Sequence, residues 1–423
     1  MLKTNIPFKN LSKIHWLNLV LFSISIFYSL LIFSEVYFHN TYMFLGGDFL
    51  SFWASGYLAN TQGYSSAYDL NQLSKIVYIY TPKPAYVTNY DFIARPTIFL
   101  PFFLLPFQIL ALIPLNPSFI FWSLLNLGGY IIYLKRFSSQ LNINLGNKEI
   151  LMFLLFFPAF KSFYWGQIGI FLLIAIGEFF LSIRDGKFYH AGVWLSLLMI
   201  KPQVLFLIIV YLLFNKQLKC LISFTLSTLS YLFISLVIAG FLGMKAWLNI
   251  LYLVSTTNIR TIGVLGMQNW KMIGLKINSL FSTNIGYLIT IIGILITIVI
   301  VIKILINNSK TYNDAYKYLA VFAATGLISP HFHIHSSIIL VPFFLLLQKH
   351  DKSMRLILIA WIILPAINEF IINIFNLMIK YQILFPYLSN IQNILTTGGI
   401  CFILSFITLI LCNNKNFELN NYN

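Results

Sequence analysis

Asp48 is the first residue whose type and surroundings could support catalysis. It stands in GGDFLSFW, residues 46–53, which follows the first long apolar run and places three aromatic residues just after the carboxylate. An aspartate ahead of a helix-forming stretch is often an N-cap. Alternatively, the aromatic neighbours would exclude water and raise the basicity of the carboxylate, while the two glycines would let the backbone approach a ligand. The sequence therefore allows two interpretations of Asp48, a helix cap and a general base.

Three of the seven histidines, His331, His333 and His335, fall within SPHFHIHSS, residues 329–337. If this segment is helical, the first and third share a face one turn apart. That spacing can bind zinc, but no third ligand or nearby glutamate completes the pattern, so we predict no metal site. We expect these histidines to bind phosphate or to transfer protons. A polar cluster at a helix end is the alternative.

Lys201 interrupts the apolar run 191–214 in the sequence KPQ. An ionisable residue inside such a run is costly and therefore indicates a functional role. The alternative is a side chain that extends to the membrane interface. Gln167, in YWGQIG, lies in the tight link between two apolar runs and is either a site residue or a turn residue. Both are candidate ligands for a phosphate-containing donor.

Two arginines, Arg95 in ARPTIF and Arg260 in TTNIRTIG, could grip a phosphate with the planar guanidinium fork, although each could also be an exposed loop residue. Asp69 and Asp91 share a loop with Asp48, and we expect them to be turn or cap residues. One acid, several cations and many aromatic residues suit the transfer of a sugar from a lipid-linked phosphate. The acid would accept the proton of an acceptor hydroxyl, and the cations would stabilise the departing phosphate.

The composition places these residues in a membrane protein. Hydrophobic residues make up 59% of the 423-residue chain and charged residues only 9%, whereas a soluble domain carries about 25% charged residues. The lipid bilayer is the solvent that this composition fits. The net charge of +16 comes from short scattered groups rather than a basic stripe, which excludes nucleic-acid binding. The three cysteines lie in or beside apolar runs, without the spacing of a metal site or a disulfide.

Apolar runs of about 20 residues predict transmembrane helices, and we expect a single polytopic domain, 1–423, of the all-α class with about 12 of them. Two long polar segments, 38–96 and 243–283, are predicted to be extracytoplasmic loops with helices, and the tail 413–423 to be disordered. The N-terminal run 16–37 is too long for a signal peptide, so we expect a retained first span. The other strong runs are 117–134, 219–242, 284–303, 354–373 and 393–412. The shorter runs are 97–114, 149–164, 168–183, 314–329 and 335–348.

Lysine and arginine orient these runs, because cytoplasmic loops carry an excess of both. This rule predicts a cytoplasmic N-terminus, and it requires that 97–114, which contains three prolines, fails to cross. It also requires 191–214 to form two short crossings that meet near Lys201. In the alternative topology, 97–114 crosses and 191–214 is one kinked span, which moves 135–148 outside. Charge favours the first topology. Its inner segments are 1–14, 135–148, 184–189, 215–219, 303–317, 349–355 and 413–423.

Several stretches, taken in order, resemble glycosyltransferase family 87, the polyprenyl-phosphate-mannose-dependent mannosyltransferases of the GT-C type. They are GGDFLSFWASGYLA, AYDL, FLPFFLLPFQIL, FFPAFKSFYWGQIGIFLL, AGVWLSLLMIKPQ and SPHFHIH, and they span roughly residues 44–340. The resemblance implies a GT-C bundle and an inverting transfer on the extracytoplasmic side, with Asp48 as the base and His331 at the position of the family's histidine. The chain departs from the family at Arg95-Pro96-Thr97, where Tyr-Pro-Pro is common, and at Ser336 and Ser337, where an acidic residue is common.

The sequence thus predicts a hexosyltransferase of the plasma (inner) membrane, with mannose as the first candidate sugar and no cofactor. Its predicted partners are a polyprenyl-phosphate-linked sugar, a lipid or glycan acceptor and the membrane lipids. A transporter or flippase of lipid-linked saccharides is the main alternative, because a broken helix at Lys201 would suit a transport site, although no internal repeat is found. A non-catalytic assembly subunit would explain the helices but not the clustering of Asp48 with the histidines.

Overall fold

The computed structural model describes residues 8–38, 45–80, 95–256, 266–281, 284–306, 314–380 and 396–414. Within these ranges every regular element is a helix, apart from an isolated bridge between Met267 and His333, which confirms the predicted all-α class. Six of the described helices are long and apolar enough to cross a membrane, so the predicted total of about 12 crossings stays a prediction. They are α1 (Phe8–Phe38), α6 (Leu115–Gln140), α12 (Leu218–Thr256), α14 (Ile285–Ile306), α17 (Lys352–Lys380) and α19 (Thr397–Asn414).

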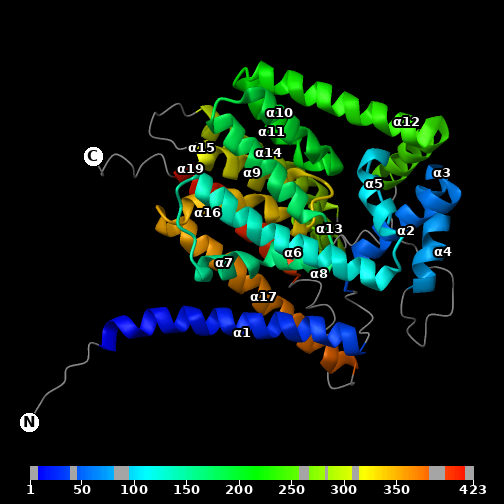
Figure 1. Ribbon diagram of the computed structural model, residues 1–423. Coiled ribbons are helices and arrows are strands. Elements are labelled where there is room, and N and C mark those ends of the chain that lie inside the picture. Colours follow the sequence, from blue (N-terminus) through cyan, green and yellow to red (C-terminus); the bar gives the residue numbers. More distant parts are fainter. Residues whose placement is uncertain are drawn as a thin grey trace, which may run out of the picture.

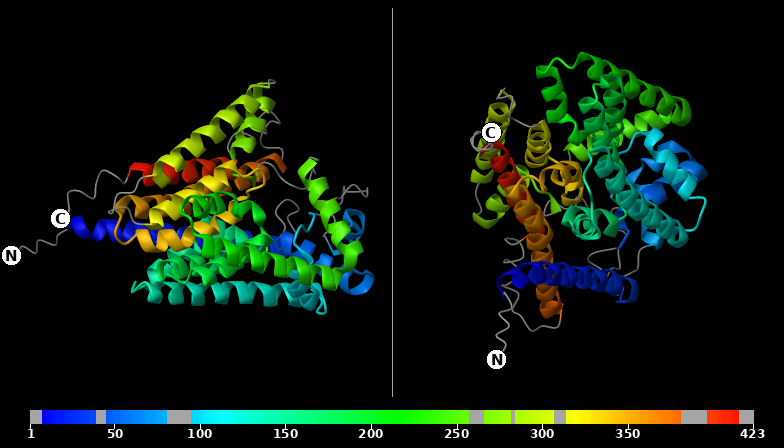
Figure 2. Two further views of the ribbon diagram at one scale, coloured as in Figure 1. Left: turned by 90° about the horizontal axis from the view of Figure 1, so that it is seen from above. Right: turned by 60° about the vertical axis from the view of Figure 1, so that its left-hand side comes forward.

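Short helices gather at one end of the long ones. In the left view of Figure 2 the long helices run from left to right, and the short helices of residues 47–110 lie at the right. Figure 1 shows the same group beside the far end of α12. This helix bends at Gly240, whose φ of 64° only glycine adopts readily, and its second half then packs over the short helices. The short helices are α2 (Gly47–Gln62), α3 (Tyr64–Ala67), α4 (Leu70–Tyr80) and α5 (Pro101–Leu110).

The run 191–214 is a hairpin rather than one kinked span. It contains α10 (Phe188–Ser196) and α11 (Phe206–Phe214), joined by the 3-10 turns η1 (Leu197–Ile200) and η2 (Pro202–Val204) on either side of Lys201. The Ser223 hydroxyl of α12 donates to the Tyr189 carbonyl at 2.7 Å, and the Ser196 hydroxyl of α10 lies 3.3 Å from the Tyr231 hydroxyl. These two contacts advance together along both helices, so α10 and α12 run parallel. The chain must therefore return along α11, as the preferred topology requires.

The run 97–114 does not cross the bundle. Its helix α5 has ten residues, about 15 Å of length against a hydrocarbon core of about 30 Å. Near its start the Phe102 amide donates to Ser235, close to the bend of α12, and just after its end the Ile113 carbonyl accepts from the Trp53 indole of the short helix α2. Pro101 starts the helix and Pro106 lies inside it. The proline-rich run is thus a short helix at one end of the molecule, as predicted.

Four of the predicted inner segments meet at the opposite end. Arg184, at the end of α9 (Gly169–Arg184), donates to the Gln140 carbonyl at the end of α6. Lys349 donates to the Asn144 carbonyl, and the contacts between α10 and α12 bring 184–189 beside 215–219. The bundle therefore has two distinct ends, one with short helices and one with these basic loops. Which end faces the cytoplasm stays a prediction from charge.

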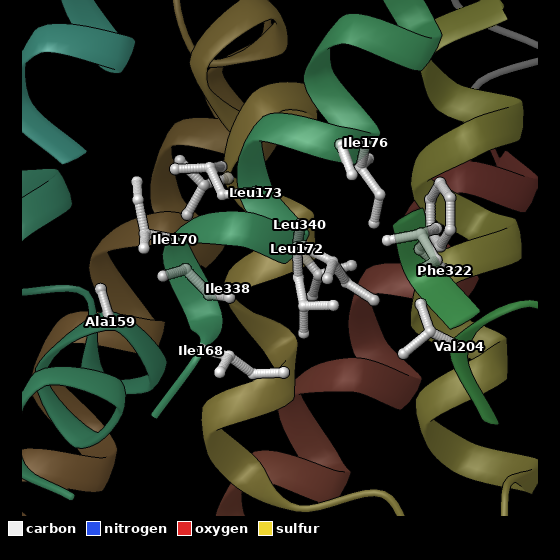
Figure 3. Close-up of a cluster of buried hydrophobic side chains, with 14 of the residues drawn as sticks. Ala159, Ile168, Ile170, Leu172, Leu173, Ile176, Val204, Phe322, Ile338 and Leu340 are labelled. Carbon is white, nitrogen blue, oxygen red and sulfur yellow. The ribbon is translucent and has the colours of Figure 1, made fainter. Parts of the chain in front are cut away.

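The core that separates the two ends is apolar and tightly buried. Figure 3 shows Ile168 and Leu172 at the start of α9 beside Ile338 and Leu340 of the 3-10 helix η4 (Ile334–Leu340), all of them at most 1% exposed. Burial of these side chains fixes η4 against α9 and so positions the residues just before each element. The remaining helices are α7 (Asn147–Leu154), α8 (Phe157–Tyr164), α13 (Trp270–Phe281), α15 (Asp314–Ile328) and α16 (Val341–Leu347).

Candidate active site

Asp48 lies in the first turn of α2, and its side chain makes no capping bond to that helix. Gly46, with a φ of 74°, occupies the N-cap position instead. The Asp48 carboxylate forms a salt bridge with Arg95 and accepts a hydrogen bond of 2.6 Å from the Gln167 amide nitrogen. The interpretation of Asp48 as a helix cap is therefore wrong. Asp69, by contrast, accepts bonds from the Asn71 and Gln72 amides and caps α4, as predicted.

The turn between α8 and α9 brings Gln167 to Asp48. The amides of Asp48 and Phe49 both donate to the Trp165 carbonyl at 3.1 Å, which pins the start of α2 onto this turn. Gly166 makes the turn possible with a φ of 66°, and a Cβ atom there would lie 2.6 Å from the Cβ of Phe49. Gln167 therefore lies in the turn and also contacts Asp48, and its role in binding the donor stays a prediction.

Lys201 is buried rather than extended to an interface. Lys201 is only 8% exposed, which excludes the alternative of a side chain that extends to the membrane interface. It sits at the break between η1 and η2, where its backbone is non-helical (φ −137°, ψ 75°) and the next residue is Pro202. Its ammonium Nζ lies 3.1 Å from the Gln167 side-chain oxygen and 2.8 Å from Nε2 of His335. Arg95, Asp48, Gln167, Lys201 and His335 therefore form one continuous chain of polar contacts.

The histidine segment is not a regular helix. Residues 329–333 link the end of α15 to η4, so His331 and His335 do not share a helical face. Instead, His333 and His335 stack with their planes 4° apart and their ring centres separated by 5.8 Å. The edge of Trp165 packs against His335, with 5.5 Å between ring centres. His333 and His335, rather than His331 and His335, are therefore the two stacked rings, and His335 joins them to the chain of polar contacts.

These residues line one cavity of about 460 Å³ at the end of the bundle that carries the short helices. Asp48 and His331 both line it, so the two residues on which the sequence prediction most depended share a pocket. One of the eight predicted site residues, Arg260, lies outside the described part of the chain. Asp91, which was predicted to be a turn or cap residue, also lies outside it. The other seven line the cavity: Asp48, Arg95, Gln167, Lys201, His331, His333 and His335.

Among the cavity residues that were not predicted, Trp165 and Ser336 contact the predicted ones. The hydroxyl of Ser336 lies 3.4 Å from the Lys201 ammonium. Trp165 lies two positions before Gln167, and Ser336 follows His335 at a position where the chain departs from the family, but neither signal assigned a role. The described residues contain no group of three histidine, cysteine or acidic side chains placed to hold a metal ion.

Burial and charge shift the protonation of the groups outside the membrane-spanning helices. Burial by itself would raise the pKa of Asp48, but the positive charge of Arg95 and the hydrogen bonds from Gln167 and Arg95 outweigh it and bring that pKa below its ordinary value. The expectation that aromatic neighbours make Asp48 more basic is therefore wrong, and the site instead holds it as a carboxylate. Burial, helped by the charge of Lys201, lowers the pKa of His333 to about 4, so this ring is neutral at pH 7. Burial and the charge of Lys271 also lower the pKa of His331.

Fold and site together define an all-α membrane protein with a charged cavity at one end of its helices. The family model of glycosyltransferase family 87 matches residues 99–330, more than half of the chain, and the protein belongs to this family. The predicted resemblance is thereby confirmed, and the chain is a membrane glycosyltransferase. Gln167 and Lys201 lie inside the matched segment, whereas Asp48, Arg95 and the three histidines lie outside it. Neither the curated proteins nor the solved structures contain a match to the chain.

Proposed function

We propose that this glycosyltransferase moves a hexosyl unit, with mannose as the first candidate, from a polyprenyl-phosphate sugar to a hydroxyl of a lipid or glycan acceptor. The transfer takes place on the extracytoplasmic side of the plasma membrane and inverts the anomeric carbon. One observation carries the proposal: a buried carboxylate and three imidazoles line the same cavity at one end of an apolar bundle. The transfer requires an ionised acid that accepts a proton. It also requires cationic or polar groups that stabilise the leaving phosphate.

In the proposed reaction the bond between the anomeric carbon and the phosphate oxygen breaks, and polyprenyl phosphate leaves with that electron pair. The acceptor oxygen forms the new bond to the anomeric carbon, and its proton passes to the Asp48 carboxylate. Arg95 uses only Nη1 on Asp48, and its other nitrogens have no protein partner among the described residues. Those nitrogens, together with His331 and His333 at the cavity wall, would contact the phosphate. Lys201 adds positive charge from behind His335.

Replacement of the base tests this function. A general base contributes about 10²- to 10⁴-fold to rate, so Asp48→Asn should lower sugar transfer by that factor in membranes supplied with a radiolabelled polyprenyl-phosphate sugar. Asp69→Asn is the matched control, because asparagine also caps α4 and Asp69 lies outside the cavity. We expect the control to transfer sugar at the wild-type rate. Undiminished turnover by Asp48→Asn would remove Asp48 from the mechanism.

The broken helix at Lys201 favours one alternative, a transporter or flippase of a lipid-linked saccharide, because discontinuous helices build many transport sites. The two functions differ in their chemistry. A transferase forms a new glycosidic bond in detergent solution, where no compartments exist, whereas a flippase forms none. Product formation by the purified protein in detergent therefore decides between them.

A further inference from the structure

Lys201 has no proton left for a ligand. A lysine ammonium carries three N–H donors and no acceptor. Three acceptors already surround Nζ: the Gln167 side-chain oxygen at 3.1 Å, Nε2 of His335 at 2.8 Å and the Ser336 hydroxyl at 3.4 Å. All three partners are buried, as is Lys201 itself. A direct contact with a donor phosphate would require one of these bonds to break.

Gln167 is equally committed, and its orientation is fixed. Its amide nitrogen donates to Asp48 at 2.6 Å, and its oxygen accepts from Lys201. A flipped carboxamide would set its N–H groups against an ammonium and its oxygen against a carboxylate, so the charges on both sides select the observed orientation. Gln167 is 7% exposed, and its carboxamide lies between the carboxylate of Asp48 and the ammonium of Lys201.

His335 depends on Lys201 in the same way. Because Nε2 accepts from the ammonium, the ring is neutral and its proton lies on Nδ1, which is buried and has no hydrogen-bond partner in the described part of the chain. The contact with Lys201 is therefore the hydrogen bond that orients this ring. His333 stacks on His335, so its placement at the cavity wall depends on Lys201 as well.

We propose that Lys201 and Gln167 are positioning residues, which set Asp48 and the stacked histidines in register, and that neither of them touches the donor. This inference rests on the proposed function and reverses the sequence-based expectation that both residues bind the donor phosphate. Lys201 holds Gln167 on one side and His335 on the other. Through these two it joins the wall that carries the base to the wall that faces the leaving group.

The test separates positioning from binding by kinetics. In Gln167→Met and Lys201→Met we expect kcat for transfer from radiolabelled polyprenyl-phosphate mannose to fall at least tenfold, while the donor KM stays within about twofold of wild type. Gln217→Met and Lys219→Met, at the opposite end of the bundle, are matched controls and should leave both constants unchanged. A donor KM that rises in step with the loss of kcat would show phosphate contact and overturn the proposal.

Two further readouts exclude a general structural defect. In Gln167→Glu the new carboxylate can pair with Lys201, which preserves folding, but it replaces the donor to Asp48 with a negative charge. The acid limb of the kcat profile should then move to higher pH. In an Asp48→Asn background, Gln167→Met should cause almost no further loss, because residues that act as a unit are not additive. An unmoved limb, or losses that multiply, would contradict positioning of Asp48 by Gln167.

The two proposals fail in different ways. If the wild-type protein transfers sugar and Asp48→Asn does not, while Gln167→Met and Lys201→Met match wild type, the proposed function stands and the positioning role is wrong. If the wild-type protein transfers no sugar from any polyprenyl-phosphate donor, the proposed function is wrong and the positioning role falls with it.

Discussion

At the scale of single residues, the pairing of Asp48 with Arg95 decides how the proposed base behaves. Aromatic burial would make a lone carboxylate hold its proton more tightly, but the adjacent guanidinium reverses that effect. The carboxylate is therefore ready to accept a proton throughout the neutral range. Its role is lost only when the pH falls through its depressed pKa, because a protonated Asp48 cannot act as a base.

Arg95→Gln tests this pairing. Loss of the positive charge removes one of the effects that lower the pKa of Asp48, so this pKa should rise and the acid limb of the kcat profile should move to higher pH. The pKa of His333 should shift upward too, since Arg95 also lowers it. Arg95→Lys keeps the charge and serves as the control, with a limb close to that of wild type. Coincident profiles for Arg95→Gln and wild type would mean that Arg95 does not set the ionisation of Asp48.

At the scale of elements, the turn between α8 and α9 holds the parts of the site together. It supplies Gln167 through its side chain and anchors α2 through the Trp165 carbonyl. A buried ion pair holds α8 itself: Lys161 lies 2.6 Å from Glu369 of α17, with side-chain exposures of 2% and 1%. Such a pair is costly unless its partners are fully satisfied, and the Thr397 hydroxyl also donates to Glu369 at 2.9 Å. The turn is thus held by α2 through the Trp165 carbonyl and by α17 through the ion pair with α8.

Gly166→Ala should destabilise the turn between α8 and α9. A left-handed backbone costs an alanine about 1–2 kcal/mol, and its Cβ would also lie 2.6 Å from Phe49. Gly186→Ala is the matched control, because its φ of 71° carries the same backbone strain while nothing lies within 4 Å of a Cβ atom there. We expect the detergent-solubilised Gly166→Ala protein to melt at a lower temperature than the control and to lose transfer activity. Equal melting temperatures would show that the close approach to Phe49 is unimportant.

At the scale of the whole molecule, the fold separates the cavity from the basic loops by the length of the bundle. The α9 helix runs from Gly169, beside the cavity, to Arg184 among the basic loops, about 24 Å for its 16 residues. The donor and acceptor would then meet at one face of the membrane only. Charge assigns the basic end to the cytoplasm.

Cysteine labelling tests this orientation. Thr61→Cys places an exposed thiol near the cavity end, and Ser139→Cys places one at the basic end, while the native Cys220, Cys401 and Cys412 are buried. In intact cells a membrane-impermeant maleimide should label the first variant and reach the second only after permeabilisation. Labelling of both thiols from the same side would contradict the separation of the two ends, and the reverse pattern would contradict the extracytoplasmic site.

The membrane class, the family and most of the candidate site residues could be predicted from the sequence, because they depend on properties of single segments. The length of an apolar run decides whether it can span lipid, and prolines decide that 97–114 cannot continue as a straight helix. A lysine in an apolar run and a cluster of histidines stand out by type alone. Those signals identified the membrane class, the family and seven residues of one cavity.

Only the tertiary structure decided how those residues pair, because hydrogen bonds act across a few ångströms of space and not along the chain. The partners of Lys201 and of Asp48 lie as far away as 135 and 119 positions in sequence. Whether Lys201 reaches an interface or a carboxamide, and whether Asp48 caps a helix or meets an arginine, depends on which helices pack together. The residue types determined what chemistry is available, and the packing of the helices determined which residue faces which.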